Sequence, residues 1–309
     1  MKSMSLNNTL VICAVALMVP VASFALDRLL SLGMIPLRPK TKAQLQASGE
    51  LPKAQSRPKK PKARGSRPAP EEEETEAPAV LRSVSPQQAY QEAVKFLTTG
   101  ELEAGRKRLL QAAEGGLAEA QFAAATYYFM GEQFPRSIAT ANNYYEKAAK
   151  QGHPMASYNI GISYADGDGV AKNDALAFKY FMQAARAGVP EGALQVAKFM
   201  DKGRGTAANP KEAATWYKKA ADGGNVEAKG YLADLYRDGD GVAANDTESL
   251  KYLQQAADGG DAQAMNDLGL RYFHGDGVKE DKALAQKLIR KAARAGNEAA
   301  ITNEASLFH

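Results

Sequence analysis

Small and apolar residues recur with one constant period between residues 112 and 296. An Ala-Ala pair, followed after two residues by a glycine, begins at Ala112, Ala148, Ala184, Ala220, Ala256 and Ala292, always 36 residues apart. A second series, close to Gly-x-Gly-Val, keeps this period at residues 167–170, 203–206, 239–242 and 275–278, with Gly131 as a degenerate first member. A constant period of this length is typical of stacked repeats, so each unit is predicted to contain two short helices and two turns.

Residue types with defined roles at helix ends occupy equivalent positions in the units. Glycine suits the left-handed residue beyond the first helix at residues 167, 203, 239 and 275, and beyond the second helix at 152, 188, 224, 260 and 296. The predicted N-caps of the second helix are Ser137, Asn173, Asn209, Asn245 and Asp281. Pro210 falls on a first helical position, and Glu212 and Glu248 lie three residues after their caps, which predicts capping boxes.

Helical spacing gathers the small and large apolar residues of each first helix on one face. The columns of this predicted core are Ala120, Ala156, Gly192, Ala228 and Ala264; Ala124, Ile160, Val196, Leu232 and Leu268; Ala125, Gly161, Ala197, Ala233 and Gly269; and Tyr128, Tyr164, Met200, Tyr236 and Tyr272. The second helix adds Tyr144, Tyr180, Trp216 and Tyr252, and also Tyr145, Phe181, Tyr217, Leu253 and Ile289. Small residues let the helices approach, and large ones fill the remaining space.

This order of small residue, Leu-Gly-like pair, Tyr, Gly-x-Gly-Val turn, cap, aromatic pair, Ala-Ala and Gly resembles the Sel1-like repeat family, which is related to the tetratricopeptide repeats. The resemblance covers five units over residues 117–297 and departs from the pattern at Thr206 and at residues 131–134. It implies an all-α fold, a right-handed α/α superhelical solenoid of helix-turn-helix repeats used as an interaction scaffold. Residues 85–116 resemble a tetratricopeptide-like hairpin, and residues 298–309 are expected to form a C-terminal capping helix, because stacked repeats need a closing element.

Three further columns of the first helix, containing residues 122, 126 and 129, lie within about 40° of one another and roughly opposite the core. Several of their side chains are large and apolar, although a solvated face would be polar. By resemblance to tetratricopeptide repeats, these columns imply a concave groove that binds a protein or peptide partner. Its candidate residues are Phe122, Phe129, Tyr158, Ile162, Leu194, Lys198, Asp201, Asp234, Arg237, Leu270 and Phe273. The alternative is that the bulky members pack on the next repeat, because solenoid helices touch neighbours on two sides.

The first 26 residues carry a predicted membrane-targeting signal. The apolar run from Leu10 to Leu26 follows Lys2 and ends in small residues that suit signal-peptidase cleavage after Ala25. At 17 residues, the run is also at the lower limit for a membrane span. Residues 1–26 are therefore a cleaved signal peptide, giving a periplasmic or secreted protein, or a single N-terminal transmembrane anchor. Both interpretations predict the cell envelope, and basic residues after the run leave a cytoplasm-facing orientation open.

Residues 27–84 are predicted to be a disordered linker. Frequent prolines, a basic block and a following glutamate run leave too few apolar residues for a core. The basic block includes Lys53, Arg57, Lys59, Lys60, Lys62, Arg64 and Arg67. It is either a solvated spacer or a patch that binds anionic lipid or a cell-wall polymer.

Charge and composition argue against several function classes. From Arg82 onward the chain has 27 basic and 28 acidic residues, which indicates no basic face for a phosphate backbone, so no nucleic-acid partner is expected. One cysteine, Cys13, and three histidines fit poorly with a thiolate metal site or a nucleophile triad. The Gly-Asp-Gly turns lack the ligand spacing of an EF-hand. No catalytic residue, metal or cofactor is therefore predicted.

The leading interpretation is a non-enzymatic, membrane-targeted adaptor whose repeats bind another protein. The second is a protein that binds an anionic polymer or lipid through the basic linker, with repeats that only support assembly. A carboxylate enzyme in the groove fits less well, because no pair of acids is singled out from the surface charge.

Overall fold

The computed structural model describes residues 84–308. The predicted targeting segment, residues 1–26, lies outside the described residues, and so does the predicted linker up to residue 83, including its basic patch from Lys53 to Arg67. Every helix discussed below lies within residues 85–308.

Between residues 84 and 308 the chain forms thirteen helices and no strand, and ten of these helices make five hairpins of equal design. The first helices of the hairpins, here called A helices, are α6 (Ala118–Met130), α8 (Pro154–Asp166), α10 (Pro190–Lys202), α12 (Val226–Asp238) and α14 (Ala262–His274). The second helices, or B helices, are α7 (Ile138–Lys150), α9 (Asp174–Arg186), α11 (Pro210–Asp222), α13 (Asp246–Asp258) and α15 (Lys282–Arg294). Units 1 to 5 each combine an A helix with the B helix that follows it.

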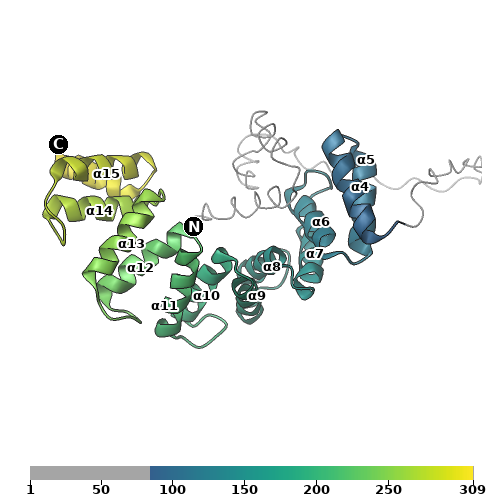
Figure 1. Cartoon of the computed structure of the whole chain (residues 1–309), viewed down its shortest axis with the longest axis horizontal. Coiled ribbons are helices and arrows are strands. Elements are labelled where there is room, and N and C mark those ends of the chain that lie inside the picture. The colour runs from purple at the N-terminus through teal and green to yellow at the C-terminus, as the bar shows by residue number, and fades with distance from the viewer. Residues whose placement is uncertain (1–83, 309) are drawn as a thin grey trace, which may run out of the picture. The chain divides into compact units, whose positions relative to one another are not determined.

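The three remaining helices lie at the two ends of this array. The hairpin of α4 (Pro86–Thr99) and α5 (Leu102–Glu114) precedes unit 1, and α16 (Glu298–Phe308) follows unit 5. Each helix packs mainly against the helices before and after it in the chain, so the hairpins stack in chain order (Figure 1). The predicted all-α solenoid of helix-turn-helix repeats is confirmed.

Side-chain caps begin the B helices at the predicted residues. Each accepts a hydrogen bond from the backbone amide three residues later, at Ser137, Asn173, Asn209, Asn245 and Asp281. The predicted capping boxes at Glu212 and Glu248 are wrong. The N-cap amide of Asn245 donates instead to the carbonyl of Tyr236, at 2.7 Å, and the amide of Asn209 is held in the same way. These bonds use the donor that a capping box needs, and they join each B helix to its own A helix.

The two glycines of each Gly-x-Gly turn serve different purposes. The first, at residues 167, 203, 239 and 275, has the predicted left-handed backbone directly after the A helix, and the glycines at 152, 188, 224, 260 and 296 have it after the B helix. The second glycine of the turn is also left-handed, and at Gly169, Gly205 and Gly241 it makes a close contact with the preceding unit. At Gly205, where φ is +63°, a Cβ atom would lie 2.2 Å from the carbonyl oxygen of Asp174. Because Asp174 begins the B helix of the preceding unit, glycine here lets consecutive units touch backbone to backbone.

The predicted core columns that contain residues 120, 124 and 125 are buried between the A and B helices, whereas in the column of Tyr128 only Met200 is buried and the tyrosines are half-buried. Exposure is at most 1% for Ala124, Ile160, Val196, Leu232 and Leu268. Near the turns, nearly parallel tyrosine rings join the two helices of a unit, with centroids 5.9 Å apart for Tyr164 and Tyr180 and 5.8 Å apart for Tyr236 and Tyr252. Such pairs stabilise a fold beyond the area they bury. The sequence period is therefore also a period of packing.

Helix α16 places a charged residue in a core column. Glu304 occupies the position that Leu268 holds in unit 5, and its carboxylate accepts a hydrogen bond from Arg290 at 2.8 Å. Phe308 packs edge to face on Phe273, with 5.5 Å between ring centroids. Because a charge at this position opposes the packing of another apolar helix, the composition of α16 suits the end of a stack.

Alanine substitution at Gly205 is expected to destabilise the protein much more than the same change at Gly188. Both residues are left-handed, which costs about 1–2 kcal/mol for alanine. At Gly188 a Cβ atom would meet nothing within 4 Å, whereas at Gly205 it would displace the neighbouring unit's backbone. That displacement adds about 1–3 kcal/mol. Urea unfolding of Gly205→Ala and Gly188→Ala measures the difference, and equal losses of unfolding free energy would contradict the proposed backbone contact.

Candidate interaction surface

The first of the three predicted surface columns is buried. Phe122, Tyr158 and Leu194 are 6%, 1% and 1% exposed, so the prediction that they face outward is wrong. Phe122 stacks on His153 of the next unit, with 4.3 Å between ring centroids, and lies 5.8 Å from Tyr145 of its own B helix. The column fills space between consecutive units, because each A helix has packing neighbours on two sides.

The other two predicted columns are accessible at least in part. Their half-buried members are Phe129, Ile162, Lys198, Asp201, Leu270 and Phe273, and their exposed members are Asp234 and Arg237. Two members of these columns are buried and were not among the predicted residues, Thr126 in unit 1 and Ala165 in unit 2. The accessible part of the predicted surface is therefore narrower than the sequence suggests and richest in units 3 to 5.

Tyr231 is an exposed aromatic residue on this surface that the sequence analysis did not predict. Its ring, 36% exposed, stacks on the buried Tyr217 of the preceding unit at 4.9 Å between centroids. The ammonium of Lys198 lies 5.1 Å from the Tyr231 ring centroid and pairs with Glu227 at 2.5 Å. Tyr231 belongs to the column of Ala123, which lies next to the buried column of Phe122. It is the lone aromatic residue of its column, and this feature of the sequence could have identified it. The columns of residues 123, 126 and 129 are together called the A face below.

Carboxylates gather on and beside the A face where units 4 and 5 meet. Arg237 pairs with both Asp234 and Asp238, at 2.8 Å each. Burial raises the pKa of Asp234, Arg237 opposes this shift, and the charges of Asp267 and Asp238 reinforce it. The carboxylate of Asp267 accepts hydrogen bonds from neutral amide side chains at 2.8–3.2 Å. One arginine thus interacts with three aspartates, which leaves this part of the surface acidic.

Gly230 interrupts the buried column of the A helices. The equivalent residues of the other units are all buried, namely Phe122, Tyr158, Leu194 and Asn266. Gly230 lies inside α12, and a Cβ atom added to it would meet no heavy atom within 4 Å. Neither packing nor backbone conformation therefore requires a glycine here, although glycine inside a helix costs about 0.5–1 kcal/mol relative to alanine.

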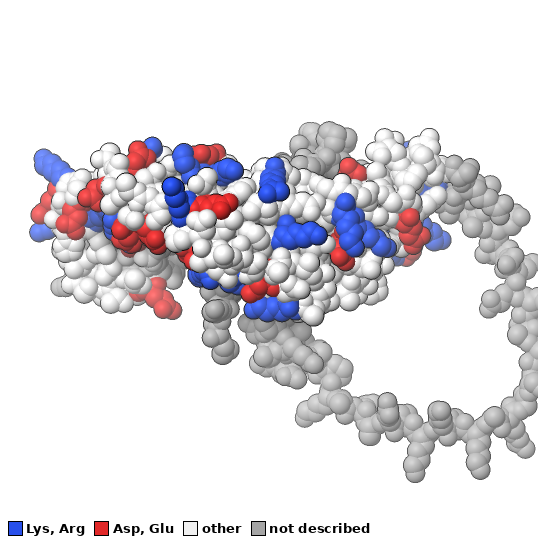
Figure 2. Space-filling model, turned by 90° about the horizontal axis from the view of Figure 1, so that it is seen from below, with Lys and Arg blue, Asp and Glu red and all other residues white. Residues whose placement is uncertain are grey.

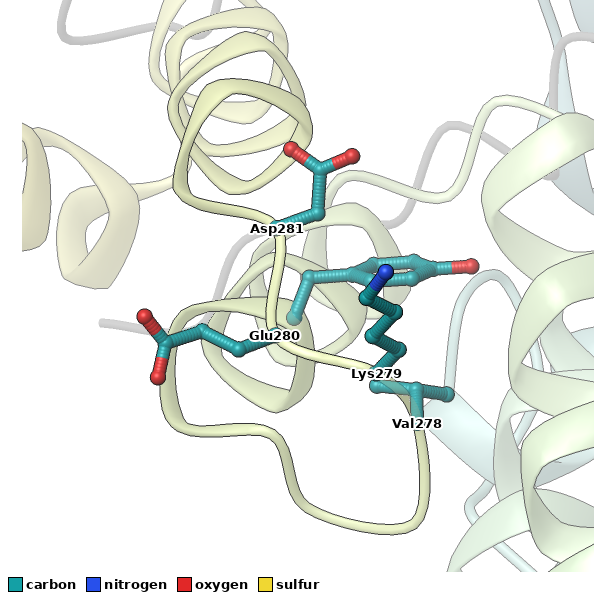
Figure 3. Close-up of a pocket in the computed structure, with 5 residues that line it drawn as sticks. Val278, Lys279, Glu280 and Asp281 are labelled. Atoms are coloured by element: carbon teal, nitrogen blue, oxygen red, sulfur yellow. The ribbon is translucent and has the colours of Figure 1, made fainter.

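An open hollow lies at the turn of unit 5 (Figure 3). Its lining consists of Tyr272, Val278, Lys279, Glu280 and Asp281. The carboxylates of Glu280 and Asp281 point apart in Figure 3. Asp281 also accepts the amide hydrogen bond of Leu284, at 2.9 Å, as the N-cap of α15. The hollow therefore does not bring two acids together for acid-base chemistry.

Other kinds of site are not evident in the described part of the chain. Between residues 84 and 308 no three histidine, cysteine, aspartate or glutamate side chains are grouped to hold a metal ion. Over the same range, none of the helices has both the length and the apolar character that crossing a membrane requires. Figure 2 shows basic and acidic side chains interspersed on the face it presents, rather than one continuous basic track.

The two leucines among the predicted surface residues are expected to respond differently to alanine substitution. Leu194 is 1% exposed, so Leu194→Ala should lower the free energy of unfolding by about 2–5 kcal/mol. Leu270 is half-buried, so Leu270→Ala removes fewer contacts and should cost clearly less. Chemical denaturation of both variants tests this, and a loss at Leu270 as large as at Leu194 would contradict the assignment of Leu270 to the surface.

Gly230→Ala is expected to stabilise the protein. The helical backbone accepts alanine and the new methyl group has open space, so the free energy of unfolding should rise by about 0.5–1 kcal/mol. Gly161→Ala is the matched control, because its Cβ would lie 2.7 Å from the ring of Phe181 and should destabilise. Thermal unfolding compares the two variants, and destabilisation by Gly230→Ala would show a packing role that the structure does not contain.

Comparison with known proteins agrees with this architecture. The Sel1 repeat family matches residues 118–153, 154–189, 190–225, 226–261 and 262–297. A Sel1 repeat protein from Oxalobacter formigenes has a crystal structure that is similar with a TM-score of 0.66 and 26% identity, over 74% of this chain and 89% of that one.

The crystal structure of c5321, a protective antigen present in uropathogenic Escherichia coli strains, displays an SLR fold and is similar with a TM-score of 0.62 and 30% identity. The match covers 71% of this chain and 50% of that one, so this chain spans about half the length of that antigen. No curated protein sequence matches the chain significantly. The five family matches cover more than half of the chain, which therefore belongs to the Sel1 repeat family.

Proposed function

We propose that this protein is a non-enzymatic scaffold of the cell envelope that binds a protein or peptide partner along its A face. Tandem helical hairpins of this family are in general protein-interaction scaffolds. The observation that carries the proposal is the exposed ring of Tyr231, which Tyr217 supports from behind and Lys198 flanks. Aromatic rings with little freedom and an accessible edge are typical anchors at the centres of protein interfaces.

The repeat architecture extends this anchor into a row. Ile162, Lys198, Asp234 and Leu270 come from consecutive A helices and occupy equivalent positions in units 2 to 5. Because the units stack in one way, a segment lying across the A helices would meet one of these side chains per unit. The row mixes apolar and charged groups, which supports a partner with both kinds of side chain.

The location in the cell envelope rests on the sequence of residues 10–26. Binding of an anionic polymer or lipid through the linker patch is the alternative function, and it rests on residues 53–67. A membrane-tethered adaptor that faces the cytoplasm is the alternative location. The compartment of the captured partner would distinguish the two locations.

A photo-crosslinking amino acid placed at Ile162, Lys198 or Tyr231 of the full chain in living cells is expected to capture one defined protein. Lys219 is the matched control, because it is exposed on a B helix, with its ammonium 3.9 Å from the ring centroid of Trp216. The captured species would be identified by mass spectrometry. Weaker capture when the unmodified chain is co-expressed in excess during irradiation would show that the capture is specific.

Two outcomes would contradict the A-face proposal. Equal capture of the same protein from Lys219 would show that the contact is not restricted to this face. The second outcome combines two results. None of the three A-face positions captures a protein, and the full chain binds anionic vesicles unless the seven linker patch residues are replaced. This outcome would favour the polymer or lipid alternative.

A further inference from the structure

The A-helix surface of unit 4 contains an unfilled side-chain position. Large or polar side chains fill this position in the other units and are buried there, whereas Gly230 leaves it open. The gap is not a packing necessity, because a Cβ atom would meet nothing within 4 Å. It is therefore a place where a side chain from outside could enter between units 4 and 5.

The repeat symmetry identifies what such a side chain would meet. Phe122 lies against Tyr145 and His153 in unit 1, and the corresponding residues around Gly230 are Leu253 and Asp261.

The tip of the entering side chain has its own neighbour. The side chain of Gln195 lies beside the hydroxyl of Tyr158 in unit 2, and the residue corresponding to Gln195 beside Gly230 is Asp267. An entering side chain would therefore have an apolar residue, Leu253, beside its stem and a carboxylate, Asp267, near its tip.

The charges around this gap favour a cation. Asp234 and Asp238 share Arg237, whereas the carboxylate of Asp267 accepts hydrogen bonds from the neutral amides of Gln263 and Asn266. Asp261 is the N-cap of α14, with its carboxylate 2.8 Å from the amide of Ala264. The pKa of Asp234 is raised by burial and by its neighbouring acids, so negative charge is already crowded here. A positive group would relieve this repulsion, and a negative one would increase it.

We propose that the gap at Gly230 receives a lysine or arginine side chain of a partner peptide, with its methylene groups on Leu253 and its charge beside Asp234 and Asp267. This inference rests on the proposed function and names the partner chemistry that the A face selects. Lysine and arginine suit the site because a long apolar stem and a terminal charge match its two parts. The neighbouring Tyr231 would contact the main chain or an adjacent side chain of the same peptide.

The test uses displayed random peptides selected on the full chain, and the tightest binders are then synthesised with a fluorescent label. Anisotropy is expected to show that one lysine or arginine in each binder is essential. Its replacement by norleucine, which keeps the stem and removes the charge, should weaken binding by about tenfold or more.

Protein variants locate this cation. Gly230→Phe fills the gap as Phe122 does in unit 1 and should weaken binding by about tenfold or more, and the smaller side chain of Gly230→Ala should weaken it less. Asp267→Asn should weaken binding, and the exposed B-helix variant Asp258→Asn should not. Asp267→Lys combined with a peptide carrying glutamate at the essential position should recover affinity. Circular dichroism and thermal unfolding confirm that each variant is folded.

Several outcomes would overturn the inference. They are unchanged affinity for Gly230→Phe, binders whose essential residue is apolar or acidic, and a selection that yields no binder sensitive to Gly230→Phe. A different result would show that this chain's own linker occupies the gap. In that case, replacing the linker patch residues would raise the affinity for the peptides, and norleucine in place of the peptide's cation would have no effect. If Gly230→Phe leaves the affinity unchanged but photo-crosslinkers at Ile162 and Lys198 still capture the peptides, the proposed function stands and only the cation site fails.

Discussion

Close approach between helices at small residues is the constraint on which this fold depends. Gly205 has no side chain because the backbone of Asp174 in the preceding unit occupies that space, and Gly241 meets Pro210 in the same way. Within the hairpins, buried alanines and glycines bring A and B helices together, so large residues such as Ile160 and Leu232 are enclosed on all sides. Every unit thus has one distance and one register to its neighbour. The constant 36-residue period follows from this geometry, because an insertion would separate surfaces that fit only at contact.

The same constraint determines which residues reach the surface. An A helix packs against neighbouring helices on two sides, so only a narrow strip of its surface is exposed to solvent. Phe122 and its buried equivalents face the neighbouring helices. Tyr231 follows Gly230, the equivalent of Phe122 in unit 4, and lies on the exposed strip. A partner can therefore contact only a few side chains per unit, and specificity must come from how those few residues differ between units.

Local rules account for most of what the sequence predicts correctly. The N-caps, the first glycine of each turn and the three core columns of residues 120, 124 and 125 depend on one helix and its spacing, and all are confirmed. The errors concern contacts between elements. Glu248 could complete a capping box by sequence, but the amide it needs is bonded to Tyr236 of the preceding helix. The helical wheel gives the direction of Phe122 from its own axis, yet the crossing of the next unit decides that this direction is buried. The role of Gly205 likewise depends on a residue 31 positions earlier.

Departures from the repeat pattern can be sorted by whether the structure compensates for them. Arg204 replaces the aspartate of other turns and bonds Asp174 at 2.7 Å, while its guanidinium lies 4.3 Å from the ring centroid of Phe199. The degenerate first turn has Phe134, which is buried and stacks on Tyr128. Both changes create new contacts that hold neighbouring parts together. Gly230 creates none, and it weakens the helix that contains it. The other four units fill this column with a buried side chain, so the gap at Gly230, beside the exposed Tyr231 and the crowded carboxylates, is the best-supported point for recognition.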